Sequence, residues 1–290
     1  MSNHIRSLKK GWKHGILNKI GMKIAVLIRV YNRIEDLKYN LQIIRDTWKE
    51  NDYYIIVVSN GKNHGYEVPA ENLPLIDQLV ILEENAGHRK GNSQLLLEGI
   101  KYIPDDCEFT IILEADTWMY TDSLISKYVH SLQQSEKAVW ASADWYDKLY
   151  ALATDFAIIK SGYIKKNAGI FDFELFPECH ISNYLRDTNA GYIWIKENMP
   201  VHVPSYIRYK YPYVPNIKEG RFYLFPRSKT VTHHVEYLKG GMEQKKRYFN
   251  ILADIDYFPE NKVEHKVWER FKMRFWIGLS ECMIKRSWYS

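Results

Sequence analysis

The sequence contains few cysteines and no long apolar run. Its three cysteines, Cys107, Cys179 and Cys282, lie far apart and form no C-x-x-C pair. An odd number of scattered cysteines indicates neither a disulfide framework nor a zinc cage, and a reducing compartment is the simplest setting. No stretch approaches the roughly 18 uninterrupted apolar residues of a membrane span, and the basic N-terminus lacks the apolar centre of a signal peptide. We therefore expect a cytoplasmic protein that is neither secreted by that route nor integral to a membrane.

The sequence also lacks a strong charge of either sign, an internal repeat and a low-complexity tract. Its formal net charge of +5 and its pI of about 8.8 are only mildly basic, which gives little support for nucleic acid as a partner. An anionic small-molecule substrate or an acidic membrane surface fits this charge equally well. The 290 residues, 46% of them hydrophobic, suffice for one large α/β domain or two modest ones.

Both ends of the chain are basic. Residues 1–21 form a basic tail without any acid, and residues 236–290 are expected to form a helical extension. Such segments either lie on an anionic membrane surface or pack on the body with their cations reaching into solvent. Peripheral contact with the inner face of a membrane is therefore an open alternative. Within this extension, residues 263–288 mix the aromatic residues Trp268, Phe271, Phe275, Trp276 and Trp288 with the basic residues Lys266, Arg270, Lys272, Arg274, Lys285 and Arg286.

From residue 23 to residue 113 the hydrophobic pattern alternates between strand and helix. Apolar runs rich in β-branched residues are typical of buried strands, and apolar residues three or four positions apart are typical of helices. The alternation predicts an α/β fold with a mainly parallel sheet, helices on both faces, and a ligand crevice at the carboxyl ends of the strands. The expected strands are 23–30, 53–58, 79–82 and 109–113, and the expected helices are 33–48 and 92–102.

The pattern is less regular in the second half of the chain. Residues 138–143 and 156–160 have the composition of strands, and residues 181–186 suit part of a helix. Residues 200–226 are dense in proline, tyrosine and basic residues without a clear period, which indicates long loops covering a site.

A pair of acids ends one of the expected strands. Residues 109–119 have the sequence FTIILEADTWM, in which an apolar run stops at Glu114 and Asp116. These residues fall on the same side of an extended backbone, so both can approach one divalent cation. Mg²⁺ and Mn²⁺ suit such oxygen ligands. The alternative is a solvated turn after a core strand.

A glycine-flanked basic turn precedes the strand that ends in these acids. Residues 85–92 have the sequence NAGHRKGN, with Arg89, Lys90 and Asn92 as donors just before an expected helix start. A helix N-terminus beside cations suits a diphosphate, and glycine permits close approach of the backbone. The alternative is an ordinary turn capped by Asn92.

Four segments together resemble a known family. The order KIAVLIRVYNR, YYIIVVSNG, ENAGHRKGN and IILEADTWM resembles the nucleotide-sugar-binding half of GT-A glycosyltransferases, in particular the family-2-like enzymes. The likeness covers residues 23–120 well and the rest loosely. It implies a GT-A, Rossmann-like domain over residues 22–235, with a nucleotide-sugar half at 22–120 and an acceptor half at 121–235.

The resemblance implies residues that hold the nucleotide. In the family, the loop that begins with Val30, Tyr31 and Arg33 meets the base and ribose, and Arg33 can reach phosphate. The alternative is a solvated Arg33 at the start of a helix. Asn60 departs from the family, which usually has a base-recognising acid here. An amide can both donate and accept a hydrogen bond, so the preferred base is open. Among the nucleotides, we expect UDP first.

The resemblance also implies a metal shell. The tripeptide Glu114, Ala115, Asp116 stands where the family has Asp-x-Asp, and the longer Glu114 side chain suggests that Asp116 binds the metal directly. Glu114 then contacts ribose or reaches the metal through water. In related enzymes a downstream histidine completes the shell; here His233 and His234 are adjacent, and we favour His233.

Two acids are candidates for catalysis. An inverting transferase needs a general base on the acceptor hydroxyl, and the family uses an acid at the start of a helix beyond the metal strand, where Glu178 lies. The alternative for Glu178 is an ordinary first-turn acid. Asp155 is a second candidate, able to bind acceptor hydroxyls. Retention of the anomeric configuration is the alternative to inversion.

The expected function is a glycosyltransferase that depends on Mn²⁺ or Mg²⁺. It would move a hexose from a nucleoside diphosphate sugar to a glycan, lipid-linked or protein acceptor. One alternative is a sugar nucleotidyltransferase, although the RVYNR loop lacks the glycine-rich signature expected after the first strand. A second alternative is a non-catalytic carbohydrate-binding relic, which the departures at Asn60 and Glu114 would permit.

Overall fold

The computed structural model describes residues 22–144, 151–198, 222–233, 235–238 and 240–283, with no account of the side chains of Met273 and residues 276–283. The basic tail at 1–21 and His234 lie outside the described residues. So does the part of the expected 200–226 loop up to residue 221, while residues 222–225 form a strand instead. Within the described parts, no helix is both long and apolar enough to cross a membrane.

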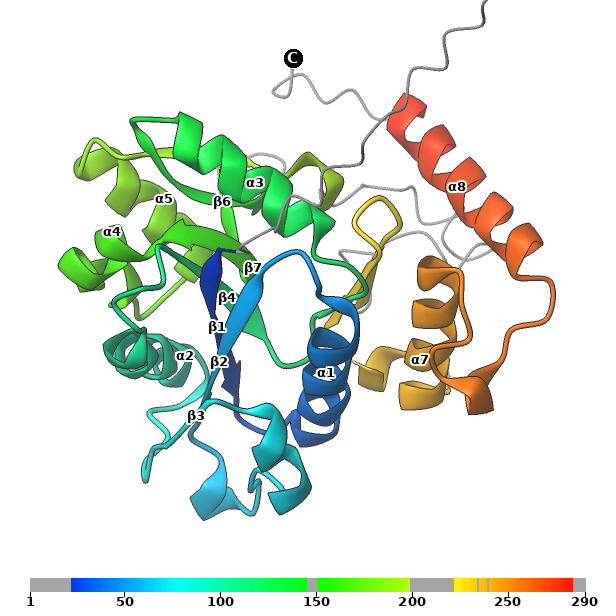
Figure 1. The fold of residues 1–290 in the computed structure, drawn as a ribbon, viewed down its shortest axis with the longest axis horizontal. Coiled ribbons are helices and arrows are strands. Elements are labelled where there is room, and N and C mark those ends of the chain that lie inside the picture. Colours follow the sequence, from blue (N-terminus) through cyan, green and yellow to red (C-terminus); the bar gives the residue numbers. More distant parts are fainter. Residues whose placement is uncertain (1–21, 145–150, 199–221, 234, 239, 284–290) are drawn as a thin grey trace, which may run out of the picture.

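A seven-stranded sheet forms the centre of the protein (Figure 1), and its strands follow the order β3-β2-β1-β4-β7-β6-β8. All neighbouring strands pair in parallel except at β7, which runs antiparallel to both β4 and β6. The mainly parallel α/β fold predicted from the sequence is therefore confirmed. The strands are β1 (Lys23–Val30), β2 (Asp52–Ser59), β3 (Gln78–Ile81), β4 (Phe109–Glu114), β6 (Ala138–Asp144), β7 (Leu152–Lys160) and β8 (Gly191–Trp194).

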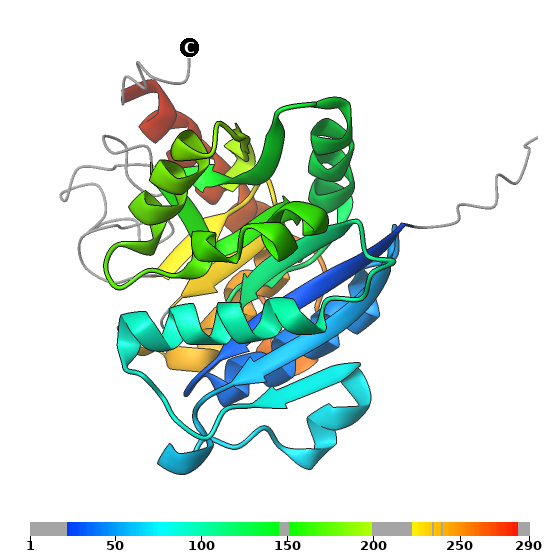
Figure 2. The same cartoon turned by 90° about the vertical axis from the view of Figure 1, so that its left-hand side faces the viewer.

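Helices cover both faces of this sheet, as Figure 2 shows for α2 in front and α1 behind. Alternate residues of β1 point to opposite faces: Val26 packs in the core under α1 and α3, whereas Leu27 packs in the core under α2, α4 and α5. Strands buried on both faces are apolar throughout, which explains the continuous apolar run of β1. The helices are α1 (Ile34–Thr47), α2 (His88–Gly99), α3 (Ser123–Gln134), α4 (Ser161–Lys166) and α5 (Pro177–Asp187).

A second, antiparallel sheet lies beside the carboxyl end of β4. It has the order β5-β10-β9, and α7 packs against it around a core that includes Trp118 and Phe249. Ile43 of α1 belongs to the same core, so α7 is joined to the nucleotide-sugar half expected from the sequence. The elements are β5 (Trp118–Met119), β9 (Phe222–Phe225), β10 (Thr230–His233), α7 (Gly241–Ala253) and α8 (Lys266–Met283).

Short 3₁₀ helices complete the described elements at Lys62–His64, Ala70–Leu75, Ile100–Tyr102, Ala168–Phe171, Lys196–Asn198, Val235–Tyr237 and Pro259–Asn261. The start of α2 differs from the sequence prediction, because the helix begins at His88 rather than at residue 92. Gly87 ends the preceding loop with a φ of 90°, a conformation that favours glycine. Gly91 lies inside the helix, where a Cβ atom would come within 2.5 Å of the Asn85 side chain. Close packing, not a break in the helix, accounts for that second glycine.

Candidate functional site

Three potential metal ligands meet where the two sheets join. Glu114 ends β4, Asp116 follows in the turn to β5, and His233 ends β10. Antiparallel pairing of β10 with β5 sets Val231 opposite Trp118 and so carries His233 to the acids. One ligand atom from each of the three side chains lies within 4.8 Å of the other two. The cluster therefore joins residues far apart in the sequence.

His233 is held by both acids. Its Nδ1 atom lies 3.2 Å from Oε2 of Glu114 and 4.0 Å from Oδ1 of Asp116. The residue is 8% exposed and has a φ of 73°, a left-handed conformation that is uncommon outside glycine. Such backbone strain persists only where the surroundings impose it, and it clusters at functional sites.

The cluster has a defined charge state. Burial by itself lowers the pKa of His233, but hydrogen bonds and charge from Asp116 and Glu114 outweigh burial and raise the pKa to about 10. Burial by itself raises the pKa of each acid. Arg29 and His233 nevertheless hold the pKa of Glu114 well below its usual range, and His233 lowers that of Asp116. Without a metal, the cluster thus consists of two carboxylates and an imidazolium whose Nδ1–H lies between them.

These donors fit a divalent cation. Two carboxylates and one imidazole are suitable ligands for Mn²⁺, whereas Mg²⁺ prefers oxygen throughout. A metal would replace the proton on Nδ1 of His233, because only the neutral ring can bind through that atom. Oε1 of Glu114 already accepts a hydrogen bond from Arg29, which leaves Oε2 as the oxygen on the cluster side.

Arg29 is a part of the site that sequence reasoning missed. It lies in β1 directly beside Glu114 in the strand register, is 4% exposed, and donates from Nη2 at 2.8 Å to Oε1 of Glu114. It also donates to the carbonyl oxygen of Thr154. The available signal was a cation inside an otherwise apolar strand, because a buried cation requires a partner.

The backbone of the acidic turn is also held from buried side chains. Asn40 of α1 donates from Nδ2 to the carbonyl oxygens of Glu114 at 3.2 Å and Ala115 at 3.1 Å. Lys245 of α7, which is 0% exposed, donates at 2.6 Å to the carbonyl oxygen of Asp116. Three successive carbonyls are thus fixed by side chains from α1 and α7. Neither Asn40 nor Lys245 was identified from the sequence.

The two candidate catalytic acids have different positions. Asp155 in β7 is 6% exposed and accepts a hydrogen bond at 3.4 Å from Oγ1 of Thr232, the neighbour of His233. Burial raises the pKa of Asp155 to about 6, with His233 acting against this and Glu114 adding to it. Glu178 lies in the first turn of α5, partly exposed. Asp155 therefore lies beside the ligand cluster, hydrogen-bonded to the residue that precedes His233.

The loop after β1 lies beside the cluster. Arg33, which precedes α1, has its Nε atom 3.9 Å from Oδ2 of Asp116 and its Nη2 atom 2.6 Å from Oε1 of Glu236. Tyr31 packs edge-on against the rings of His64, at 5.7 Å, and Tyr66, at 5.2 Å. Arg33 thus stands between the acidic turn and solvent.

Asn60 joins the end of β2 to α2. It is 2% exposed and donates from Nδ2 at 3.3 Å to the carbonyl oxygen of Gly91, while its buried Oδ1 accepts no hydrogen bond from the described residues. The amide N–H of Asn60 donates to the carbonyl of Val30, the last residue of β1. Because β1, β2 and β4 run parallel, Val30, Asn60 and Glu114 all lie at one edge of the sheet.

The basic residues of the glycine-flanked turn lie inside α2. Arg89 and Lys90 occupy its first turn, not the loop before it, so the expectation that they precede the helix was wrong. The Arg89 guanidinium lies 5.1 Å from the centre of the Phe176 ring, and Lys90 lies 3.5 Å from Glu174. Asn92 is likewise within the helix and does not cap it. The basic side chains thus lean toward the loop that leads into α5.

The chain is similar to several solved structures, all at low sequence identity. No protein-family model and no curated protein matches the sequence. The chain is similar to the mannosyltransferase PcManGT of Pyrobaculum calidifontis, solved with GDP-Man and Mn²⁺ (12% identity, TM-score 0.49, covering 87% of this chain and 68% of that one). The chain is also similar to S. aureus TarS in complex with UDP (12% identity, TM-score 0.47, covering 87% of this chain and 70% of that one). The match to a longer TarS chain covers 36% of that chain.

A third similar structure is the 4-diphosphocytidyl-2C-methyl-D-erythritol synthase of Anaerococcus prevotii (14% identity, TM-score 0.42, covering 60% of this chain and 88% of that one). Solved structures of glycosyltransferases are among those that this chain is similar to.

Proposed function

We propose that the protein is a metal-dependent glycosyltransferase that moves a sugar from a nucleoside diphosphate sugar to a glycan, lipid-linked or protein acceptor, with inversion. The observation that carries the proposal is the convergence of Glu114, Asp116 and His233 within 4.8 Å at the carboxyl edge of a parallel sheet. Ligands bind at this edge in open α/β sheets. Buried polar residues fix the turn between the acids, as expected for a preorganised site.

The three ligands would hold Mn²⁺ or Mg²⁺, and the geometry within the cluster favours Mn²⁺ because of the imidazole. A bound divalent cation supplies positive charge to the departing diphosphate, where negative charge accumulates in the transition state. Arg33 adds a fixed cation 3.9 Å from Asp116. Arg29 and Asn40 hold Glu114 in place, so little reorganisation accompanies binding.

The nucleotide would lie along the sheet edge between Val30 and α2. Tyr31 offers a ring face or edge to the base, and Asn60 offers a buried acceptor that an imide N–H of uracil or guanine can satisfy. Arg89 and Lys90 supply positive charge near the α2 N-terminus for the diphosphate. UDP is the nucleotide that we expect first.

The general base is proposed to be Glu178, at the start of α5. The buried carboxyl of Asp155 bonds to Thr232 beside His233, which suits a group that steadies the ligand cluster; contact with acceptor hydroxyls remains our sequence prediction for it. A base must reach the attacking hydroxyl within hydrogen-bond distance. Glu178→Gln should therefore lower kcat while leaving the affinity for the donor nucleotide unchanged.

The test measures release of nucleoside diphosphate from a panel of UDP- and GDP-sugars, with and without Mn²⁺. Slow hydrolysis of one donor that requires Mn²⁺ and is abolished in Asp116→Ala supports the transferase. Asp187→Asn, an exposed acid at the end of α5, serves as the matched control and should retain activity. Release of pyrophosphate from a nucleoside triphosphate and a sugar phosphate would identify a nucleotidyltransferase instead. Sugar-nucleotide or glycan binding without turnover would identify a relic.

A further inference from the structure

The helix α8 carries a stripe of exposed apolar side chains. Val267 is 78% exposed, Trp268 55%, Phe271 57% and Phe275 53%. At 3.6 residues per turn these four positions fall within an arc of about 100° on the helix. We call these four residues the α8 stripe. Four large apolar side chains on one surface helix are unusual, because scattered single residues are the rule on soluble surfaces.

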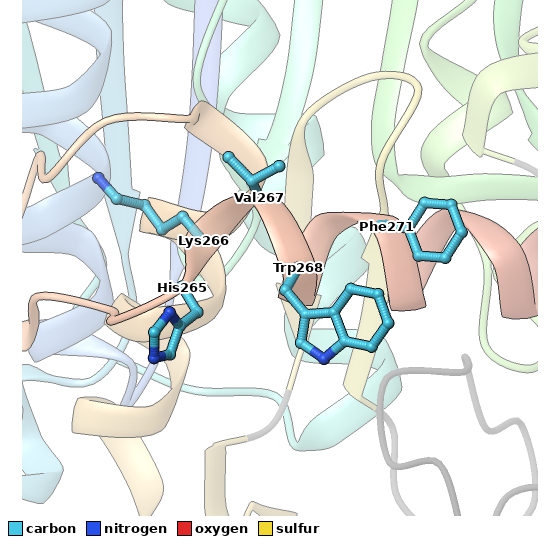
Figure 3. Close-up of a pocket in the computed structure, with 5 residues that line it drawn as sticks. All are labelled: His265, Lys266, Val267, Trp268 and Phe271. Carbon is cyan, nitrogen blue, oxygen red and sulfur yellow. The ribbon is translucent and has the colours of Figure 1, made fainter.

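Neighbouring rings of the α8 stripe stack on one another. The Trp268 and Phe271 rings stack at 5.5 Å, and the Phe271 and Phe275 rings follow at 6.4 Å. An open hollow of about 570 Å³ adjoins the start of the helix and is lined in part by Val267, Trp268 and Phe271. Figure 3 shows the Trp268 and Phe271 rings projecting outward from the ribbon, with His265 and Lys266 at the start of the helix.

Cations both flank the stripe and hold the helix to the body. By helical position, Arg274 lies at one side of the stripe and Lys272 at the other. Lys272 lies 5.5 Å from the centre of the Trp268 ring and pairs at 2.9 Å with Glu269, which lies on the opposite face.

Two further cations pair with the segment that follows α7. Lys266 lies 2.8 Å from Asp256, and Arg270 pairs with Asp254. The helix is thus attached on one side while its aromatic side is exposed.

We propose that the α8 stripe docks the protein on an anionic lipid surface. Aromatic residues on one face of a helix, flanked by lysine and arginine, place rings at the boundary of headgroups and acyl chains and place cations beside lipid phosphates. Charge complementarity selects this partner, because the stripe is bordered by positive charge. In sequence, the basic tail at 1–21 and the pair Lys285 and Arg286 add charge of the same sign. The proposal uses none of the residues assigned to glycosyl transfer.

The experiment is flotation of the full chain with vesicles of phosphatidylcholine, alone or mixed with phosphatidylglycerol. The protein should bind the mixed vesicles, and added salt should weaken the binding. Trp268→Ser with Phe271→Ser should lower the partition coefficient by about tenfold or more, from the lost apolar burial. Neutralising Lys272 and Arg274 to Gln should lower it by about fivefold for each cation. Leu73→Ser and Lys49→Gln, exposed positions outside α8, are the matched controls.

Three results would overturn the proposal. Equal binding of the stripe variants and the wild type would exclude the stripe, and equal binding to phosphatidylcholine alone would exclude an anionic surface. A dimer in sedimentation velocity that the stripe variants dissolve, without vesicle binding, would show that a second copy covers the stripe. Thermal midpoints confirm that the variants fold. Asp116→Asn should bind vesicles like the wild type, so failure of the proposed enzymatic function would leave this result interpretable.

Discussion

Lys245 lies 2.6 Å from Oδ1 of Asp36 and 2.6 Å from the carbonyl oxygen of Asp116, which ties α7 to α1 and to the acidic turn at one atom. Its Nζ atom also lies 4.3 Å from the centre of the Trp118 ring. A fully buried ammonium requires such partners, because desolvating a charge is costly. The C-terminal part of the chain therefore shapes a site whose ligands lie mostly in the N-terminal part.

Replacing Lys245 should damage both stability and metal binding. Lys245→Met leaves the buried carboxylate of Asp36 without its partner, and losing one member of a buried pair costs about 3–5 kcal/mol. Loss of the bond to Asp116 should weaken Mn²⁺ binding by about 10- to 100-fold, as is usual for residues that orient metal ligands. Urea denaturation and Mn²⁺ titration measure the two effects. Arg247→Met, an exposed cation on the same helix, should change neither.

A second variant separates the two roles of Lys245. Asp36→Asn with Lys245→Met removes both charges, so the stability lost should be smaller than the sum of the single losses. The Mn²⁺ affinity should stay low in the double variant, because the carbonyl of Asp116 still lacks its donor. Recovery of full affinity in the double variant would show that Lys245 does not position the turn.

The sheet and the acid pair could be predicted from the sequence because both depend on local patterns. Apolar runs specify buried strands, and the position where β4 becomes polar marks its carboxyl end. His233 was found only through the family resemblance, since no local pattern connects it to Glu114. Lys245 could not be found at all. In sequence it is one of two adjacent lysines on an amphipathic helix, and its burial depends on how α7 packs against Trp118.

The start of α2 shows a different limit. Two glycines flank the basic residues, and either could end a loop. Only the structure shows that Gly87 takes the left-handed conformation while Gly91 packs closely against Asn85 and Asn60. The donors Arg89 and Lys90 are therefore carried by the first turn of α2 and not by the loop before it.

Arg29 should be essential for the arrangement of Glu114. Arg29→Met removes the buried cation that donates to Oε1 of the partly buried Glu114 carboxylate, so the free energy of unfolding should fall by about 3–5 kcal/mol. Arg29→Lys should recover only part of the loss, because the lysine side chain ends one bond short of the Nη2 atom that contacts both Glu114 and Thr154. Chemical denaturation of the three proteins tests this order. Equal stability of Arg29→Met and the wild type would contradict the pairing.

The stability of the metal-free protein should depend on the protonation of His233. Its pKa rises from 6.5 to about 10 on folding. A group whose pKa is raised stabilises the fold fully below the unfolded value, and this contribution is lost as the pH rises through the folded value. In the presence of a chelator, stability should therefore fall between pH of about 6.5 and about 10. In His233→Gln this part of the pH dependence should vanish, and thermal melts across this range compare the two proteins.

Metal binding should release a proton. At neutral pH His233 carries a proton that must leave before Nδ1 can bind a cation. Calorimetric titration of Mn²⁺ in buffers of different ionisation enthalpy should show close to one proton released per cation, and affinity should rise with pH. His233→Gln should bind Mn²⁺ more weakly without proton release. If the wild type releases none, His233 is not a ligand.

Asn60 should control which base is bound, given the proposed function. Its buried Oδ1 accepts no hydrogen bond from the described residues, while its Nδ2 donates to the carbonyl oxygen of Gly91 in α2. Asn60→Ala should weaken binding of the preferred nucleoside diphosphate by about tenfold, the usual effect of losing one hydrogen bond. Asn60→Asp keeps an acceptor but loses the donor to Gly91, so it should retain base preference with reduced affinity. Titration of UDP and GDP against both variants measures this, with the exposed Asn63→Asp as the control. An unchanged affinity for both nucleotides in Asn60→Ala would place the base elsewhere on the sheet edge.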